Sequence, residues 1–492
     1  MKRVDFTPFL YIPLLLAVVV LAVPLSGQPR IYVVNNLGTL GGTGQSNATS
    51  INNAGQVAGS SDMPGDQTYH AFRTAPNSAI NPATDDLGTL GGGYSNASSI
   101  NSSGQVVGSA NLPGDTVGHA FRTGANAAIN PATDDLGTLG GRYSSATGIN
   151  DSGQVAGFSN YSPGIFHDHA FRTSPNAAIN PATDDLGTLG GTIIQAKGIN
   201  GSGQVIGTSF LAGDQINHGF RTAPNTPINP LTDDLGTLID GGTSDAFGLN
   251  NSGQVVGQSY NFEGSIRRAF RTAPDAPINP ATDDLGQLTG MGNGAVAINN
   301  AGDVVGIADL SGTDFETARG VVYTGGVLYD LNRLLVPGSG WLVDSAFGIN
   351  DVGQIAGSGV HSGQGRDRAV LLDPLPVMGI LVNPGTPRPA SLNIDSEGAL
   401  PVAILGSASL NVTAIDPASA LFGPNGARNI RTPVIQDVNK DGKPDLVLYF
   451  APDDSGINCT DKIAALVAST FSKQMFAGVE TIQTTHTFPC PR

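Results

Sequence analysis

Positive charge, aromatic residues and cysteine are all scarce in this chain of 492 residues. Lysine and arginine number 24 against 40 aspartate and glutamate residues, which gives a net charge of −16. A protein that binds nucleic acid needs a basic surface against the phosphates, so this balance argues against a nucleic-acid partner and fits an extracytoplasmic surface. Because only 6% of the residues are aromatic, small residues and valine, isoleucine and leucine must pack the core.

Apolar runs long enough to cross a membrane occur only near the start of the chain. Lys2 and Arg3 precede the apolar stretch 9–25, and small residues follow it. This order is typical of an export signal, so we predict a signal peptide over 1–28 and an extracellular or cell-surface protein. The alternative is an uncleaved membrane anchor, because the stretch is close to the minimum length for a span.

Helical periodicity is also missing, and a repeated motif takes its place. The motif is an alanine, an isoleucine–asparagine pair, two small or polar residues, Gly-Gln-Val, an apolar residue and glycine. The pair recurs at spacings of 49, 49, 50, 50, 49 and 51 residues, and so regular a period is the signature of a repeat architecture. The seven pairs are Ile51-Asn52, Ile100-Asn101, Ile149-Asn150, Ile199-Asn200, Leu249-Asn250, Ile298-Asn299 and Ile349-Asn350.

Each motif contains a turn signal between two apolar runs, as in 97–101 and 105–109. Asparagine and glycine in the order Asn-x-x-Gly favour a tight turn, so the two runs predict a hairpin. A glycine inside the second run, such as Gly108, predicts close approach of another backbone. Further apolar runs at 119–123 and 135–139 bring the count to four strands in each period, which is the size of one β-propeller blade.

The two ends of the repeat region complement each other. Residues 31–40 match the fourth strand of a repeat without a preceding hairpin, whereas the seventh repeat stops after its third strand, 368–372. Pairing these two strands would close a ring and leave no exposed edge. We therefore predict an all-β fold, with a seven-bladed β-propeller over 31–374 that the N-terminal strand closes.

The rest of the chain departs from the repeat. Prolines crowd 375–390, which predicts a linker, and 391–492 alternates apolar runs with turns, which predicts a small β-sandwich. In repeats one to five, a link with Asn-Pro and an aspartate pair joins the third and fourth strands, as in 75–86. We interpret this link as an elaboration of one rim rather than as part of a sheet.

Three motifs occur together and in fixed order over 36–374: Asp-Leu-Gly-Thr-Leu-Gly-Gly, Ile-Asn-x-x-Gly-Gln-Val-x-Gly and His-Ala-Phe. In these motifs the chain resembles the bacterial extracellular HAF repeats. The resemblance implies an exported bacterial protein with a β-propeller fold, and it implies no particular activity. The C-terminal part is similar, at 400–405, 422–426 and 437–445, to an accessory module of exported bacterial and archaeal proteins, which implies no catalytic role.

Oxygen-bearing side chains at closely spaced positions form the sharpest candidate site. They are Asp437, Asn439, Asp441 and Asp445, to which the main-chain carbonyl of Lys443 adds a ligand. This spacing suits a structural calcium ion, with Gly442 at the bend of the loop. The twelfth position holds Leu448 instead of glutamate, so the loop is not an EF-hand, and the alternative is a solvated turn.

Cys459 and Cys490 are the only two cysteines. Export favours a disulfide between them, which stabilises the chain by about 3–4 kcal/mol in the chain-entropy model. The alternative is a pair of free thiols in a reducing compartment. A catalytic cysteine has little support, because no histidine is convincingly placed beside either residue.

Several polar residues recur with the repeats, and recurrence favours a structural role over a catalytic one. We expect the recurring histidines to cap a strand or bond a neighbouring backbone, rather than to serve as ligands or acid–base groups. We expect aspartate pairs such as Asp85-Asp86 to keep loops soluble, rather than to hold cations at the rim. The histidines are His70, His119, His169 and His218, and Arg268, Arg319 and Arg368 replace them in the last three repeats.

No motif with known catalytic mechanics is present, neither a Gly-x-Ser-x-Gly elbow nor His-Glu-x-x-His nor a phosphate loop. The main expectation is therefore a non-catalytic cell-surface or secreted scaffold that binds a glycan or an envelope protein. The alternatives are an extracellular hydrolase or lyase acting at the central face, and a structural spacer. An enzyme would need non-repeating polar residues, which include His167, Glu263, Asp309, Asp314, Glu316, His361 and Asp367.

Overall fold

The computed structural model describes residues 27–161, 167–261, 263, 266–287, 292–309, 318–363 and 365–486. Within these ranges the chain forms β-strands and short 3-10 turns without an α-helix, so the all-β prediction is confirmed. No helix in the same ranges has the length and apolar character of a membrane span. Except for Gly27 and Gln28, the predicted signal peptide 1–28 lies outside the described residues.

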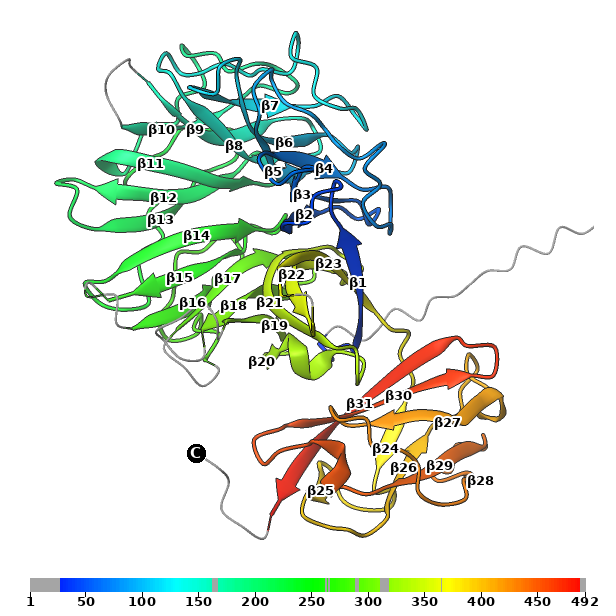
Figure 1. Cartoon of the computed structure of the whole chain (residues 1–492). Helices are drawn as coiled ribbons and strands as arrows, with labels where there is room; N and C mark the ends of the chain where they lie inside the picture. The colour runs from blue at the N-terminus through cyan, green and yellow to red at the C-terminus, as the bar shows by residue number, and fades with distance from the viewer. Residues whose placement is uncertain are drawn as a thin grey trace, which may run out of the picture.

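Each repeat forms its own antiparallel sheet, and the sheets follow one another in chain order (Figure 1). The first three are β2 (Ser46–Ile51), β3 (Val57–Asp62) and β4 (Tyr69–Arg73); β5 (Ser95–Ile100), β6 (Val106–Asn111) and β7 (Gly118–Arg122); and β8 (Ser144–Ile149), β9 (Val155–Asn160) and β10 (Asp168–Arg172). The next two are β11 (Gly190–Ile199), β12 (Val205–Leu211) and β13 (Asn217–Arg221), and β14 (Thr243–Leu249), β15 (Val255–Tyr260) and β16 (Arg267–Arg271). The sixth is β17 (Gly292–Ile298), β18 (Val304–Asp309), β19 (Ala318–Thr324) and β20 (Val327–Asp330), and the seventh is β21 (Trp341–Ile349), β22 (Ile355–His361) and β23 (Arg368–Pro374) with β1 (Tyr32–Gly38).

The hairpin in each motif forms as predicted. In the second repeat the backbone N–H of Gly104 donates to the carbonyl of Asn101 at 3.1 Å, and Gly104 has a φ of 76°, which favours glycine. The glycine inside the second strand also has the expected cause. A Cβ atom on Gly108 would lie 1.8 Å from the carbonyl oxygen of Asn96, so no larger residue fits there.

The expected fourth strand is wrong for repeats one to five, whose sheets have three strands. The segment pairs with the third strand only through an isolated bridge, such as Phe72 to Asp86. The Asp86 carboxylate then accepts a hydrogen bond from the N–H of Gly88 at 2.8 Å, and Gly88 has a φ of 70°. This local turn bends the chain out of the ladder after one residue pair.

The N-terminal strand completes the seventh sheet. Strand β1 runs antiparallel to β23, with Val33 opposite Asp373 and Asn35 opposite Leu371. The predicted pairing between the first strand and the seventh repeat is therefore present. The sixth sheet gains its fourth strand differently, because β19 and β20 form a tight hairpin.

The links of repeats one to five lie outside the sheets, as interpreted from the sequence, and they also connect neighbouring repeats. The N–H of Ile129 in the second link donates to the carbonyl of Leu87 in the first repeat at 2.8 Å, and the Ile129 side chain is 9% exposed. Ile80, Ile179, Ile228 and Ile278 make the same bond in the other four links. An apolar side chain in each link thus fills the junction with the preceding repeat.

Apolar cores lie between consecutive repeats. In one core, Ala58 and Ala71 of the first repeat pack with Ala97 and Phe121 of the second. The phenylalanine is fully buried in each of the first five repeats, and in repeats one, three and five its ring lies against the glycine of the neighbouring strand. The small residues of one sheet leave space for one large ring of the next sheet. The two sheets can therefore pack closely although the chain has few aromatic residues.

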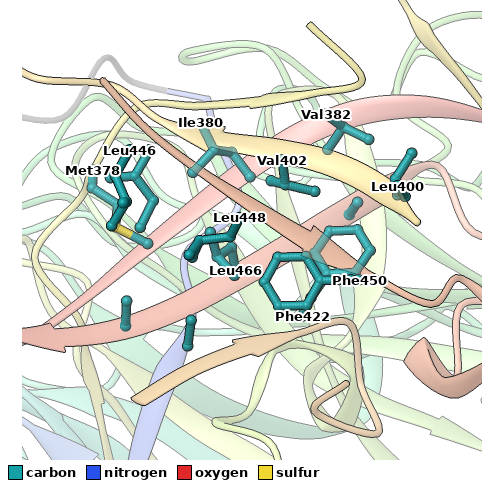
Figure 2. Close-up of a cluster of buried hydrophobic side chains, with 14 of the residues drawn as sticks. Met378, Ile380, Val382, Leu400, Val402, Phe422, Leu446, Leu448, Phe450 and Leu466 are labelled. Atoms are coloured by element: carbon teal, nitrogen blue, oxygen red, sulfur yellow. The ribbon is translucent and has the colours of Figure 1, made fainter. Parts of the chain in front are cut away.

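The C-terminal part forms two four-stranded sheets around one core. One sheet is ordered β24-β26-β29-β28 and the other β25-β31-β30-β27. Figure 2 shows the core between them, in which the rings of Phe422 and Phe450 stack 5.1 Å apart beside Leu448 and Val402. The strands are β24 (Ile380–Val382), β25 (Ala390–Asn393), β26 (Leu400–Ile404), β27 (Ile415–Phe422), β28 (Val434–Gln436), β29 (Asp445–Phe450), β30 (Ile463–Thr470) and β31 (Met475–Thr485). Since β24 falls within 375–390, this part of the fold begins before residue 391.

The C-terminal sheets share a core with the last repeats. Val467 and Ala477 pack in one cluster with Tyr32 and Leu334, which belong to the repeat region. Arg333 forms an ion pair with Asp461 across the same contact. The ring of Tyr32 is enclosed there, and burial raises the pKa of its hydroxyl above the ordinary value.

Candidate functional site

The asparagine of each isoleucine–asparagine pair links its repeat to the next one. The Asn52 side chain donates from Nδ2 to the main-chain carbonyl of Asn101 at 3.0 Å, and the series ends with Asn350 donating to Asn52 at 3.0 Å. The five intermediate bonds, from Asn101, Asn150, Asn200, Asn250 and Asn299, measure 3.1–3.2 Å. Seven hydrogen bonds therefore form a closed circuit through the seven repeats.

These asparagines, which we call the asparagine ring, have their hydrogen-bonding capacity used internally. Asn200 also donates to Oε1 of Gln204, and its Oδ1 accepts from the N–H groups of Ser202 and Gln204. An aspartate could not donate, and an alanine would leave all of these groups without their partner. The recurring asparagine is thus a structural residue, as its recurrence suggested.

The residue after each asparagine forms a second circle, which we call the mouth positions. Together with the isoleucines and the asparagine ring, these positions line an opening of about 260 Å³. The opening lies at the end of the first strand of every sheet, where the hairpin turns begin. The mouth positions are Asn53, Ser102, Asp151, Gly201, Asn251, Asn300 and Asp351.

The mouth contains two carboxylates and no other ionisable side chain among its lining residues, namely Asp151 and Asp351. Asp351 accepts hydrogen bonds at 2.9 Å from the N–H and the Nδ2 of Asn300 and from the Nδ2 of Asn53. Partial burial would raise the pKa of Asp351, but these hydrogen bonds outweigh it and hold the pKa below the ordinary value. Asp351 is therefore kept as a carboxylate.

Asp151 has a different environment. Its Oδ1 accepts a hydrogen bond from the N–H of Ser102 at 2.9 Å. The two carboxylates belong to repeats three and seven, which are separated by repeats four to six on one side of the ring and by repeats one and two on the other. They therefore lie on opposite sides of the opening.

A second depression adjoins the mouth at Asn53 and has a volume of about 420 Å³. It is lined by Asn77, Gln354 and Asp373, at the junction of the seventh repeat with the first. The first link borders this depression, because Gln354 donates to Asn77 at 2.7 Å, which is the contact that Gln56 makes with Asn126 of the second link at 3.0 Å. The sixth and seventh repeats lack the link.

Asp151 and Asp351 are not among the site residues predicted from the sequence. A signal was available, because the position after a constant asparagine varies among asparagine, serine, glycine and aspartate. Most of the proposed non-repeating residues do not approach the mouth. His361, for example, packs against Trp341 with ring centres 5.2 Å apart, while Asp314 and Glu316 lie outside the described residues.

The recurring histidines contact carboxylates rather than backbone groups. The Nδ1 atom of His119 lies 2.9 Å from Oδ1 of Asp135, and His70, His169 and His218 make the same contact with Asp86, Asp185 and Asp234. In the fifth repeat Arg268 takes this role with Asp284 at 3.0 Å. The preceding aspartate is also engaged, since Asp134 accepts from the N–H of Asn130 at 2.8 Å. The aspartate pairs therefore hold the links in shape, and the expectation that they serve loop solubility is wrong.

The predicted calcium loop is only partly assembled. The N–H groups of Asp441 and Gly442 donate to Asp437, and the N–H of Lys443 donates to Asp441 at 2.8 Å, which lowers the pKa of the Asp441 carboxyl. Asp445 is fully buried, and its two oxygens accept from the N–H groups of Gly406 and Val438 at 2.9 Å. The described part of the chain contains no cluster of three or more His, Cys, Asp or Glu side chains placed to hold one metal ion. Calcium at Asp437, Asn439, Asp441, Lys443 and Asp445 stays a prediction.

The predicted disulfide also stays a prediction. Cys459 lies in the loop before β30, and Thr484 of β31 donates to its main-chain carbonyl at 2.9 Å. Cys490 lies outside the described residues.

No protein-family model matches the chain, and no curated protein matches it. Among solved structures the chain is similar to a novel fungal alcohol oxidase of the AA5 family in complex with copper. The match has 12% sequence identity and a TM-score of 0.39, over 93% of this chain and 100% of the other.

This match corrects one expectation from the sequence. A non-catalytic scaffold or binding protein was the main expectation, and one of the solved structures that the chain matches is an enzyme. This finding runs against the non-catalytic expectation and establishes no activity for this chain. A TM-score of 0.39 at 12% identity transfers neither the copper nor the oxidation to this chain, so its chemistry has to be argued from its own residues.

Proposed function

We propose that this chain is an exported glycoside hydrolase, built on a seven-bladed β-propeller, with its active site at the mouth. The observation that carries the proposal is the pair of carboxylates Asp151 and Asp351 in a lining that is otherwise uncharged. Most glycoside hydrolases use two carboxylic acids that flank the scissile bond. A ring of seven blades in which only two blades supply an acid provides the asymmetry that an active site requires.

The different environments of the two carboxylates suggest their roles. Asp351, stabilised as a carboxylate by three hydrogen bonds, is assigned as the base that activates water. Asp151, with one backbone donor, is assigned as the acid that protonates the leaving oxygen. The two groups reach the opening from different repeats, as residues that flank a scissile bond would.

The lining of the mouth favours a neutral sugar substrate and hydrolysis over elimination. Amide and hydroxyl groups from Asn53, Ser102, Asn251 and Asn300 surround the carboxylates and suit the hydroxyl groups of a sugar. The lining residues include no histidine, tyrosine, lysine or arginine to abstract a carbon-bound proton or neutralise an acidic sugar. The depression at the junction of repeats seven and one gives a polymer a route away from the mouth.

Release of reducing sugar from neutral polysaccharides by the purified chain tests the proposal. Asp151→Asn is the sharpest variant, because Asn251 already accepts the equivalent backbone bond, from Gly201 at 2.9 Å. We expect Asp151→Asn and Asp351→Asn each to lower kcat by roughly 10²–10⁴-fold. Gly201→Ser, which copies the residue of the second repeat, is the matched control and should retain activity. Unchanged rates in both aspartate variants would overturn the assignment.

The remaining expectations are part of the same proposal. The signal segment supports export, and the motifs resemble those of HAF repeats. Calcium at the 437–445 loop would stabilise the C-terminal β-sandwich without taking part in hydrolysis. A chelator should then lower the unfolding temperature and leave the activity at 25 °C unchanged, and an unaltered unfolding temperature would remove calcium from the account.

A further inference from the structure

A group of tyrosines lies at the end of the ring opposite the mouth. Tyr94 immediately precedes β5 and Asn101 immediately follows it, so the two residues stand at opposite ends of the same strand. A strand of six residues spans about 20 Å. The same relation holds in the third repeat between Tyr143 and Asn150. The tyrosine surface is therefore distinct from the proposed hydrolytic site.

The tyrosines follow two successive junctions between repeats. The rings of Tyr69 and Tyr94, from the first and second repeats, have centres 5.1 Å apart. The ring of Tyr143 lies against Gly118 of the second repeat, at the position that Tyr69 occupies in the first. Tyr161 continues the series in the third repeat, where its ring lies 4.2 Å from that of His169. We call Tyr69, Tyr94, Tyr143 and Tyr161 the tyrosine strip.

Three of these tyrosines are exposed, in contrast to the aromatic residues that recur in the same repeats. Tyr69, Tyr143 and Tyr161 are 43%, 37% and 38% exposed, whereas the recurring phenylalanines are fully buried. The strip also departs from the repeat, because Gln45 and Ile193 stand at the position of Tyr94 and Tyr143 in the first and fourth repeats. A residue needed only to build a sheet would recur in every repeat, so the strip serves a purpose outside the fold.

The surroundings of the strip identify the kind of partner. Asp115 lies beside Tyr94, where it accepts from the N–H of Gly93 at 2.7 Å and from Asn111 at 3.2 Å. These groups provide hydrogen-bond partners for hydroxyl groups, and the net charge of −16 repels polyanions, although Arg142 is exposed next to Tyr143. Rings set among carboxylates and amides also lack the continuous apolar core of a protein interface.

We propose that the tyrosine strip binds a neutral polysaccharide, with sugar rings lying on the exposed faces of successive tyrosines. The C–H groups on one face of a sugar carry partial positive charge and pack against the negative face of an aromatic ring, while its hydroxyl groups bond to nearby amides and carboxylates. The strip lies at the end of the ring opposite the mouth, so it provides a second binding site for a polymer. This inference does not depend on hydrolysis at the mouth.

Affinity electrophoresis of the full chain in gels containing soluble starch, xylan, galactomannan or mixed-linkage β-glucan tests the proposal. We expect retardation by at least one of these polymers and none by alginate or heparin. The double variant Tyr94→Ala/Tyr143→Ala should weaken the retardation at least about tenfold. The double variant Tyr94→Phe/Tyr143→Phe keeps the rings and should bind like the original chain, and it also guards against misfolding.

Tyr260→Ala is the matched control, because Tyr260 ends β15 on the same side of the ring but lies outside the strip. It should leave binding unchanged. Equal retardation of the original chain and the double alanine variant would overturn the proposal, as would the absence of retardation by every neutral polymer. Asp151→Asn should bind like the original chain, so a failure of hydrolysis and a failure of this strip are distinguishable.

Discussion

The asparagine ring and the mouth positions are adjacent along the chain, yet they differ in what they tolerate. The first is asparagine in all seven repeats and uses its side chain to connect sheets, whereas the second is asparagine, serine, glycine or aspartate. A bond between neighbouring mouth positions joins the backbone N–H of one residue to a side-chain oxygen of the next. Several residue types supply each of these groups. A repeat protein can therefore place a reactive group one residue from its most constrained position.

The largest expected effect separates charge at the mouth from bonding in the asparagine ring. Asp351→Asn should lower the hydrolytic rate by roughly 10²–10⁴-fold and change the free energy of unfolding by less than about 1 kcal/mol. The amide still accepts from the N–H of Asn300. Steady-state rates and denaturant unfolding check both parts, and a fall in stability of several kcal/mol would show that Asp351 is chiefly structural.

The reverse behaviour is expected one residue earlier. Asn200→Ala leaves the buried carbonyl of Asn250, the side chain of Gln204 and the turn N–H groups without their partner, so we expect a loss of about 2–4 kcal/mol in the free energy of unfolding. Gly201→Ser, at the neighbouring mouth position, copies Ser102 and should change stability by less than about 0.5 kcal/mol. If the two variants unfold at the same denaturant concentration, the contrast between the positions is wrong.

A smaller effect is expected at the links. Ile129→Ala removes a nearly buried side chain from the junction between repeats one and two, at a cost of about 2 kcal/mol. Ala127→Ser, in the same link but exposed, is the control and should have little effect. Equal stability of the two variants in urea would show that the Ile129 side chain does not stabilise the junction.

The smallest effect concerns the histidine–aspartate pairs. His218→Ala should cost about 0.5 kcal/mol at neutral pH, since the Asp234 side chain is 32% exposed and solvent screens the pair. Burial would raise the pKa of Asp234, but the bonds from His218 and the N–H of Gly236 lower it below the ordinary 3.8. Because the folded value is lowered, this stabilisation is present above pH 3.8 and disappears as the pH falls through the folded value.

Unfolding of His218→Ala and the original chain, compared at pH 7 and pH 2.5, measures this dependence. The difference in stability should shrink at the lower pH. Arg268→Ala removes the equivalent partner of Asp284 in the fifth repeat and is the matched comparison. A difference that grows on acidification would contradict the sign of the argument.

Much of the fold follows from the sequence because it depends on local signals that are written seven times. The Asn-x-x-Gly turn, the close approach at Gly108 and the pairing of β1 with β23 could all be predicted. The missing fourth strand could not, because the apolar run 135–139 has a strand pattern while the Asp135 side chain bends the backbone within it. The contact of Ile129 with Leu87 depends on which neighbour lies beside the link, and a linear pattern does not contain that information.

The candidate site was harder to predict than the fold. Asp151 and Asp351 are ordinary turn residues in sequence, and their meaning comes from the circle that brings repeats three and seven to one opening. The 437–445 loop is the opposite case, in which the sequence pattern predicts more of a site than the structure assembles. Its spacing predicts five ligands, but two backbone N–H groups occupy the carboxylate of Asp445.

Comparison of the single and double aspartate variants tests the central claim most directly. If Asp151 and Asp351 act on the same bond, removing either one disables the reaction, and the double variant Asp151→Asn/Asp351→Asn should be no slower than the slower single variant. The measurement is kcat/KM for one neutral polysaccharide across all four proteins. Losses that multiply in the double variant, or an original chain that hydrolyses no such polymer, would contradict the account.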